Sequence, residues 1–261
     1  MQISKRLKAV ADMVTPGCRL ADIGTDHAYI PIYLAQAEKI SSAVAMDVNR
    51  GPLERAQEHI HSALLESVIE TRLSDGLCAL QPGEADDIVI AGMGGPLTVR
   101  ILQEGESKLQ KGCRLILQPQ SDIREVRAYL EKTGCRIIRE EIVCEEGKFY
   151  PMMKAVVGAL EKKDAYDREC GEKGGDSDCQ DDHEAGLRYG ALLIERCHPV
   201  LREYLLREQI LNRRILASLE GQTGENAAVR RQEVVYGLRI IENILKKYGG
   251  QDEDWKNTGE T

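Results

Sequence analysis

The amino-acid sequence predicts an α/β protein: a mixed, mostly parallel seven-stranded sheet followed by a C-terminal antiparallel helical hairpin. Between Leu20 and Val157, short β-rich runs alternate with helix-like stretches, a pattern typical of parallel strands joined by crossover helices. The last two β-rich runs follow each other without a helix, which indicates an antiparallel pair and makes the sheet mixed. Beyond them, two long helical patterns share a short connector, which favours a hairpin.

The elements of the sheet domain follow from hydrophobic periodicity. An opening amphipathic helix is predicted from Ser4 to Val14. Strands are predicted at residues 19–23, 42–47, 68–73, 86–91, 113–118, 136–143 and 150–157. Crossover helices are predicted at residues 28–38, 51–65, 95–108 and 122–133. We expect the last two strands to pair through a turn at Glu145–Lys148.

The C-terminal part of the chain is predicted to be helical. Two patterns, residues 187–220 and 227–248, flank the sequence GQTGEN, and Pro199 is expected to split the first of them. In the second pattern, apolar residues recur at steps of four and three and form a one-sided seam: Val234, Leu238, Ile241, Leu245 and Tyr248. The expected organisation is a sheet domain at 1–160, an acidic flexible linker at 161–186, the hairpin at 187–248 and a disordered tail at 249–261.

Charge is distributed unevenly in this chain of 261 residues and net charge −8. Residues 161–186 carry 4 basic and 10 acidic side chains and almost no apolar ones, too few to offset the entropy of ordering. Residues 187–248 carry 11 basic and 7 acidic side chains. The acidic total argues against broad nucleic-acid affinity, whereas the hairpin offers a local positive surface.

Composition excludes several classes of protein. The chain is long enough to bury a core without disulfides or a structural metal. It has no apolar run of membrane-spanning length, and the N-terminus MQISKRLKAV does not resemble a signal peptide, so we expect a cytoplasmic protein. The eight cysteines never form a CxxC motif, which favours buried thiols in a reducing compartment and no metal site.

The motif RLADIGTDHAYIPIYLA combines an apolar strand ending in Asp22, a turn at Gly24 and an amphipathic helix. Such a turn presents backbone N–H groups at a helix N-terminus and favours an anionic group. A dinucleotide site would need further glycines, and Asp26 would repel a diphosphate. S-adenosylmethionine fits better, because its amino group can meet Asp22. The alternative is an ordinary tight turn.

Two more acidic residues follow predicted strands. Asp47 ends the second strand, 23 residues after Gly24, where a carboxylate can accept hydrogen bonds from the two ribose hydroxyls of a nucleoside. Asp75 follows the third strand beside Gly76 and could accept from an adenine amino group. Carboxyl ends of parallel strands share one edge of a sheet, so these acids should line one crevice. A solvated loop aspartate and a simple turn are the respective alternatives.

Weaker signals come from the next loops. In the segment AGMGG, Gly92, Gly94 and Gly95 give an open rim without side chains, which suits a flat ligand or simply a loop that needs positive φ. Gln118 and Gln120 follow the fifth strand and either touch substrate or cap the next helix.

The remaining polar residues carry less information. Lys5, Arg6 and Lys8 of the opening helix could bind RNA phosphates or form a solvated face. His59 and His61 are interpreted as surface residues.

Together these motifs resemble the bacterial tRNA adenine-N1 methyltransferase family that modifies adenine 22. The resemblance covers residues 3–157 and rests on ISKRLKAVADMV, DIGTDHAYIPIYL, DVNRGPL, SDGL, AGMGG, LQPQ and FYPMMKAVV. It implies a Rossmann-like class I methyltransferase fold with a C-terminal coiled-coil hairpin, the cofactor S-adenosyl-L-methionine and a tRNA partner. The cofactor positions that it implies are Asp22, Gly24, His27, Asp47, Asp75, Gly76 and Gly92, to which we add Met93. The sequence departs from the family at Gln120, where asparagine is usual, and in the long acidic linker.

The chemistry of the expected reaction suggests two catalytic residues. N1 of adenine has an in-plane lone pair and needs no prior deprotonation, so positioning matters more than base strength. Asp26 would stabilise the developing positive charge or accept a proton from the exocyclic amine, and Tyr29 would stack on the base. His27 would orient the cofactor.

Three alternatives remain open from sequence alone. The chain could be a small-molecule methyltransferase that dimerises through its hairpin, or a non-catalytic RNA-binding protein that kept the fold. A nicotinamide dehydrogenase is disfavoured by the missing diphosphate glycines. We expect a monomer that binds tRNA and neither a membrane nor a metal.

Overall fold

The computed structural model describes residues 2–159, 177–221 and 224–257. The chain divides into an N-terminal unit, Met1–Gly171, and a C-terminal unit, Glu172–Thr261, which are described separately.

The N-terminal unit is built on a seven-stranded sheet of order β3-β2-β1-β4-β5-β7-β6. Its strands are β1 (Cys18–Ile23), β2 (Ile40–Asp47), β3 (Ile69–Leu73), β4 (Asp87–Met93), β5 (Arg114–Pro119), β6 (Arg136–Glu145) and β7 (Lys148–Val156). Its helices are α1 (Lys5–Ala11), α2 (Tyr29–Gln36), α3 (Arg50–Ser62), α4 (Gly95–Glu104), the 3-10 helix η1 (Glu106–Lys108) and α5 (Ile123–Lys132). The first five strands pair in parallel and β7 pairs antiparallel with β5 and β6, which confirms the predicted mixed sheet.

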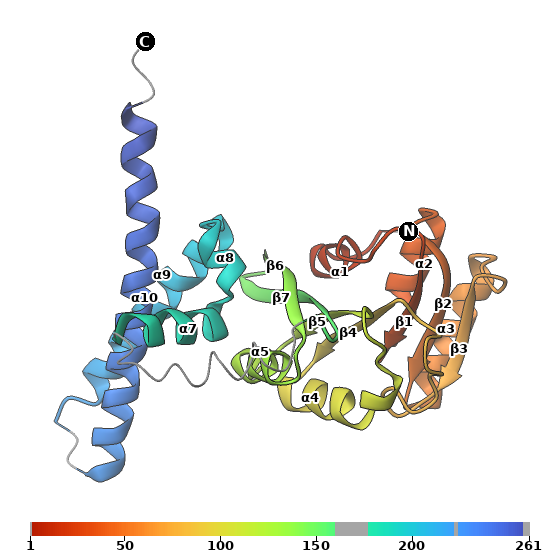
Figure 1. The fold of residues 1–261 in the computed structure, drawn as a ribbon, viewed down its shortest axis with the longest axis horizontal. Helices are drawn as coiled ribbons and strands as arrows, with labels where there is room; N and C mark the ends of the chain where they lie inside the picture. The colour runs from red at the N-terminus through yellow and green to blue at the C-terminus, as the bar shows by residue number, and fades with distance from the viewer. Residues whose placement is uncertain (1, 160–176, 222–223, 258–261) are drawn as a thin grey trace. The chain divides into compact units, whose positions relative to one another are not determined.

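The sheet is buried on both faces. Figure 1 shows α1 and α2 over one face and α4 and α5 over the other. In β4, Val89 belongs to the hydrophobic cluster on the first face, whereas the next residue, Ile90, belongs to the cluster on the second. This explains why the central strands read as continuous apolar runs.

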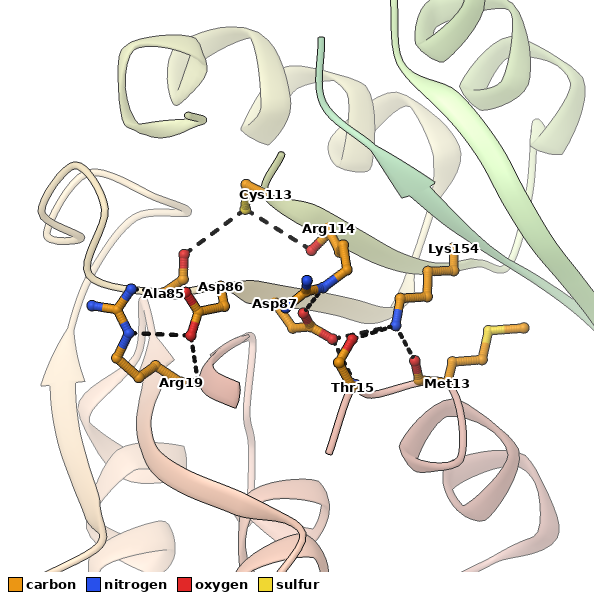
Figure 2. Close-up of polar contacts among 9 residues, drawn as sticks. All are labelled: Met13, Thr15, Arg19, Ala85, Asp86, Asp87, Cys113, Arg114 and Lys154. Carbon is orange, nitrogen blue, oxygen red and sulfur yellow. Dashed lines mark hydrogen bonds and ion pairs between the residues drawn. The ribbon is translucent and has the colours of Figure 1, made fainter. Parts of the chain in front are cut away.

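A buried charged cluster fastens the segment after α1 to the sheet (Figure 2). Asp87 is fully buried, accepts a hydrogen bond from the Thr15 backbone N–H at 2.8 Å, and pairs with Arg114. The Lys154 ammonium donates to the Met13 carbonyl at 2.7 Å and lies 3.5 Å from the Asp87 carboxylate. Burial lowers the pKa of Lys154. These groups compensate one another, and removing one would leave a buried charge unpaired.

The C-terminal unit contains α7 (Ser177–Tyr189), α8 (Ala191–Glu195), α9 (Pro199–Ser218) and α10 (Glu225–Asn257). The start of α9 meets the end of α10, since the Tyr248 hydroxyl donates to the His198 carbonyl at 3.0 Å. Further along, Arg213 pairs with Glu242 at 3.0 Å. The two helices are therefore antiparallel, as predicted, and Pro199 opens α9 rather than interrupting it.

Two predictions about this part of the chain were wrong in part. Residues 161–176 lie outside the described residues, but the predicted linker continued to 186, whereas α7 begins at Ser177. Its acidic residues find basic partners on α10: Asp181 pairs with Arg239 and Asp182 with Lys247. The predicted disordered tail began at 249, yet α10 continues to Asn257. Glycine weakens a helix by only about 1 kcal/mol per residue, so the glycine pair after Tyr248 does not end it.

The described cysteines are free thiols: Cys18, Cys113 and Cys135 are buried, Cys144 and Cys197 are half-buried, and Cys78 is exposed. Among the described residues, none of the helices combines the length and hydrophobicity that a membrane span needs.

Candidate active site

Two buried carboxylates mark the carboxyl edge of the sheet. Asp22 in β1 is 4% exposed, and Asp47 at the end of the neighbouring β2 is 7% exposed. Burial raises the pKa of Asp22 to about 6; the Thr25 hydroxyl, which donates to Asp22 Oδ2 at 2.6 Å, opposes the shift, and the charge of Asp47 adds to it. The predicted pair of acids therefore lies close together and is electrostatically coupled.

Backbone N–H groups hold the Asp47 carboxylate in place. The Asn49 N–H donates to Oδ1 at 2.8 Å, and the Asp26 N–H approaches Oδ2 at 3.4 Å. The Asp26 N–H is thus directed at a carboxylate and is not free to bind a phosphate. This geometry suits a ligand with hydroxyl groups and a positive centre better than a diphosphate.

The loop after β1 needs glycine at its first position. Gly24 has φ +69°, and its N–H donates to the Met46 carbonyl at 2.8 Å. A Cβ at Gly24 would collide with the side chain of Met93, the last residue of β4. The structure therefore brings two predicted cofactor residues, Gly24 and Met93, into contact.

Asp26 lies on the open side of the site. Its side chain is 61% exposed, and its carboxylate is 3.5 Å from both Arg55 Nη2 and His27 Nε2. Arg55, in α3, was not predicted, although it follows the motif DVNRGPL by only two residues. The expected catalytic acid is thus accessible to a base that enters from solvent.

Three rings stack beside this loop. The centroid of His27 lies 5.1 Å from that of Tyr29 and 5.3 Å from that of His59, with interplanar angles of 21° and 25°. His59 Nδ1 is also 3.2 Å from the His27 carbonyl oxygen. The prediction that His59 is a surface residue was therefore wrong, because the stack half-buries it; His61 is exposed as predicted.

One ring nitrogen of the stack can still form a hydrogen bond. His27 Nδ1 is buried and has no hydrogen-bond partner within the described part of the chain. Tyr29 is 37% exposed, so one ring of the stack remains accessible.

The loop after β3 completes this side of the crevice. Ser74 is buried, and its hydroxyl donates to the Gly76 carbonyl at 2.9 Å and accepts from the Ala79 N–H at 3.0 Å. Gly76 has φ +52°. The Asp75 side chain is exposed and makes no hydrogen bond with the described residues, so it stays available for a ligand.

The basic residues of α1 point in different directions. Lys5 Nζ donates to the Cys144 carbonyl at 3.1 Å, and Lys8 pairs with Asp12 at 2.6 Å. Arg6 instead reaches the end of β5, where Nη1 donates to Gln118 Oε1 at 2.9 Å. The three side chains that the sequence grouped as one patch thus contact three different parts of the fold, and RNA binding by them stays a prediction.

The rim after β4 lies beside this arginine. A Cβ at Gly92, whose φ is +83°, would sit 3.6 Å from Arg6 Nη1 and 3.7 Å from Gln120 Nε2. Gln118 is fully buried. Its amide N–H donates to the Pro119 carbonyl at 3.2 Å and its amide oxygen accepts from Arg6, so the side chain does not cap the next helix.

The chemistry of the site fits S-adenosylmethionine. Two adjacent buried carboxylates can accept from an ammonium group and from ribose hydroxyls, and Gly92 leaves open space at the rim of the site. Within the described ranges, no group of three or more His, Cys, Asp or Glu side chains could hold a metal ion.

Comparisons with known proteins agree with this chemistry. A methyltransferase domain model matches residues 3–153. The tRNA (adenine(22)-N(1))-methyltransferase of Bacillus subtilis (strain 168) is 41% identical over 167 residues, covering 64% of this chain and 69% of that protein.

Solved structures extend the similarity over both units. The crystal structure of the B. subtilis m1A22 tRNA methyltransferase TrmK has a TM-score of 0.79 and 32% identity, covering 93% of this chain and 98% of its own. Streptococcus pneumoniae Sp1610 in complex with S-adenosyl-L-methionine has a TM-score of 0.75 and 32% identity, covering 94% of this chain and 100% of its own. The chain therefore belongs to the tRNA (adenine-22-N1)-methyltransferase family. It has the Rossmann-like fold of that family, whose cofactor is S-adenosylmethionine.

Proposed function

We propose that this protein transfers a methyl group from S-adenosylmethionine to N1 of adenine 22 in tRNA. The observation that carries the proposal is the coupled pair of buried carboxylates, Asp22 and Asp47, beside a glycine turn that lacks the features of a diphosphate site. The choice of adenine 22 of tRNA as the methyl acceptor rests on membership of the family.

The cofactor would be held by groups that the fold already orients. Asp22 would accept from its amino group, Asp47 from its ribose hydroxyls and Asp75 from its adenine amino group. His27 would use its unpartnered Nδ1 to orient the cofactor. Gly24 and Gly76 would supply the left-handed backbone of the loops around it, Gly92 would leave space beside it, and Met93 would pack between it and Gly24. When bound, the cofactor supplies an electrophilic methyl group on a sulfonium centre.

The residues of the chain then have to position a base rather than activate it. The half-exposed ring of Tyr29 offers a stacking surface already ordered by His27 and His59. Asp26 would stabilise the positive charge that develops on adenine, because its carboxylate is the acid on the open side of the site.

A folded tRNA must also be held while adenine leaves its stack, at a cost of a few kcal/mol. We propose that the C-terminal unit contributes phosphate contacts through exposed arginines of α9 and α10: Arg207, Arg213, Arg214 and Arg230. Lys5 and Lys8 are exposed on α1 and would add to them. Binding should therefore weaken steeply with salt. A tRNA substrate is consistent with the cytoplasmic location expected from the sequence, and we keep the monomeric state as a proposal.

The experiment that tests the function is direct. The protein is incubated with methyl-labelled S-adenosylmethionine and unmodified tRNA, and the labelled nucleoside is mapped by mass spectrometry. We expect 1-methyladenosine at position 22, and no label in a matched tRNA with guanine at that position. Label on another nucleotide, or turnover of metabolites but not of tRNA, would refute the proposal.

A further inference from the structure

Arg6 lies at the active site rather than on the outer face of α1. Its Nη1 donates to Gln118 Oε1 at 2.9 Å, and its Cζ lies 5.6 Å from the ring centroid of Tyr150. Arg6 therefore links three separate parts of the fold: α1, the carboxyl end of β5 and β7.

The helix that carries Arg6 is fastened at both ends. At its start, the Lys5 backbone N–H donates to Glu145 Oε1 at 2.6 Å. At its end, Arg139 Nη1 donates to the Asp12 carbonyl at 2.9 Å, and the next residues join the buried charged cluster of Figure 2. The backbone of α1 is therefore fixed, and the hydrogen bond to Gln118 holds the guanidinium, so less ordering remains for a ligand to impose.

The charge of Arg6 has no counterion within the described part of the chain. No carboxylate of the described residues forms an ion pair with it, and its hydrogen-bond acceptor is the neutral amide of Gln118. Gln118 is fully buried, and its own amide N–H donates to the Pro119 carbonyl. A guanidinium has five N–H donors, so most of those of Arg6 remain unused in a partly buried position.

The unused donors are next to the candidate cofactor site. Arg6 Nη1 lies 3.6 Å from where a Cβ of Gly92 would be, so this glycine keeps the space beside the guanidinium open. Met93, the next residue, reaches across to Gly24.

We propose that Arg6 binds an anionic oxygen in the active site, and that Gln118 is its positioning residue. The inference rests on the proposed function, which offers two such groups: the carboxylate of the cofactor and a phosphate of the target nucleotide. The adenine ring and the sulfonium do not qualify, because both carry positive charge during the reaction and a guanidinium would repel them.

The test uses the full-length chain with Arg6→Gln and, as a matched control, Arg100→Gln. Arg100 is a surface arginine of α4 that pairs with Glu104, so the control removes the same charge elsewhere in the same unit. Calorimetry measures the affinity for S-adenosylhomocysteine and for its decarboxylated analogue, 5′-deoxy-5′-(3-aminopropylthio)adenosine. Fluorescence anisotropy measures binding of unmodified tRNA at several salt concentrations.

The two sources give different results. If Arg6 binds the cofactor carboxylate, Arg6→Gln lowers the affinity for S-adenosylhomocysteine about 10-fold or more, and the decarboxylated analogue binds wild type and variant equally. If Arg6 binds a phosphate, cofactor affinity is unchanged, tRNA binding weakens, and its log–log salt slope falls by about one. Arg6→Lys should restore part of either loss.

Two outcomes would overturn the inference. One is that Arg6→Gln changes neither affinity; the other is that it weakens both cofactor compounds equally. Gln118→Glu provides a second probe, since its carboxylate would neutralise Arg6 and should reproduce the loss seen in Arg6→Gln. All of these measurements are of binding and none needs turnover. If wild type does not methylate tRNA, the proposed function is refuted, but the binding measurements still test the role of Arg6.

Discussion

Asp22→Asn should make the protein more stable at neutral pH while weakening cofactor binding. The Asp22 carboxyl is 4% exposed and its pKa is raised to about 6 from 3.8, chiefly by burial. An ionised carboxylate is therefore forced into a poorly solvated place above pH 6. Asparagine has almost the same shape, and its amide oxygen can still accept the hydrogen bond from the Thr25 hydroxyl.

The sign and size follow from proton linkage. Because the folded pKa of Asp22 lies above its unfolded value, its favourable contribution is fully present below 3.8 and is lost as pH rises through about 6. One pKa step corresponds to about 1.4 kcal/mol, so the ionised group costs the folded state about 2–3 kcal/mol at neutral pH. Recovering about half of this would raise Tm by roughly 2–6 °C.

Thermal unfolding of wild type and Asp22→Asn at pH 4.5 and pH 7.5 tests this directly. We expect a higher Tm for the variant at pH 7.5, a much smaller difference at pH 4.5, and at least about a 10-fold loss of S-adenosylhomocysteine affinity. A variant that is less stable at pH 7.5, or one whose gain is the same at both pH values, would refute the burial argument. Unchanged cofactor affinity would refute the role of Asp22 in binding.

Three further predictions concern other parts of the molecule. Gly24→Ala should cost about 1–2 kcal/mol through its positive φ and also weaken cofactor binding, because the new methyl would displace the Met93 side chain. Gly112→Ala, with φ +90° and open space around it, should cost stability only, and urea unfolding with calorimetry separates the two. Asp87→Asn should destabilise by about 3–5 kcal/mol, because it leaves the buried Lys154 and the partly buried Arg114 without their carboxylate; a loss under 1 kcal/mol in urea unfolding would contradict the role of the cluster in Figure 2. Truncation after Gly158 should preserve S-adenosylhomocysteine affinity but impair tRNA methylation. A full methylation rate in the truncated protein would show that the C-terminal unit is not needed for RNA recognition.

The strands of the sheet could be predicted from the sequence within about two residues, because a sheet buried on both faces leaves uninterrupted apolar runs. The carboxylates Asp22 and Asp47 could be predicted for the same reason, since each ends such a run. Strand order brings them together, and that order follows from the rules for crossover connections.

Other residues of the site could not be predicted because their roles depend on long-range packing. Arg6 looked like one of three equivalent basic residues of a helix, and its partner Gln118 lies 112 positions away in the chain. His59 carries no local signal, yet α3 places it against His27. Helix α7 was misjudged because its composition is that of a disordered segment, and the basic side chains that compensate it belong to α10.

Crystals of the full chain grown with S-adenosylhomocysteine will show whether the acidic edge formed by Asp22 and Asp47 holds the methyl donor. We expect electron density for the compound along the ends of β1 and β2, with its amino group at Asp22 and its ribose hydroxyls at Asp47. If the density lies anywhere else, or if a dinucleotide displaces the compound from the loop at Gly24, Asp22 and Asp47 do not form the cofactor site.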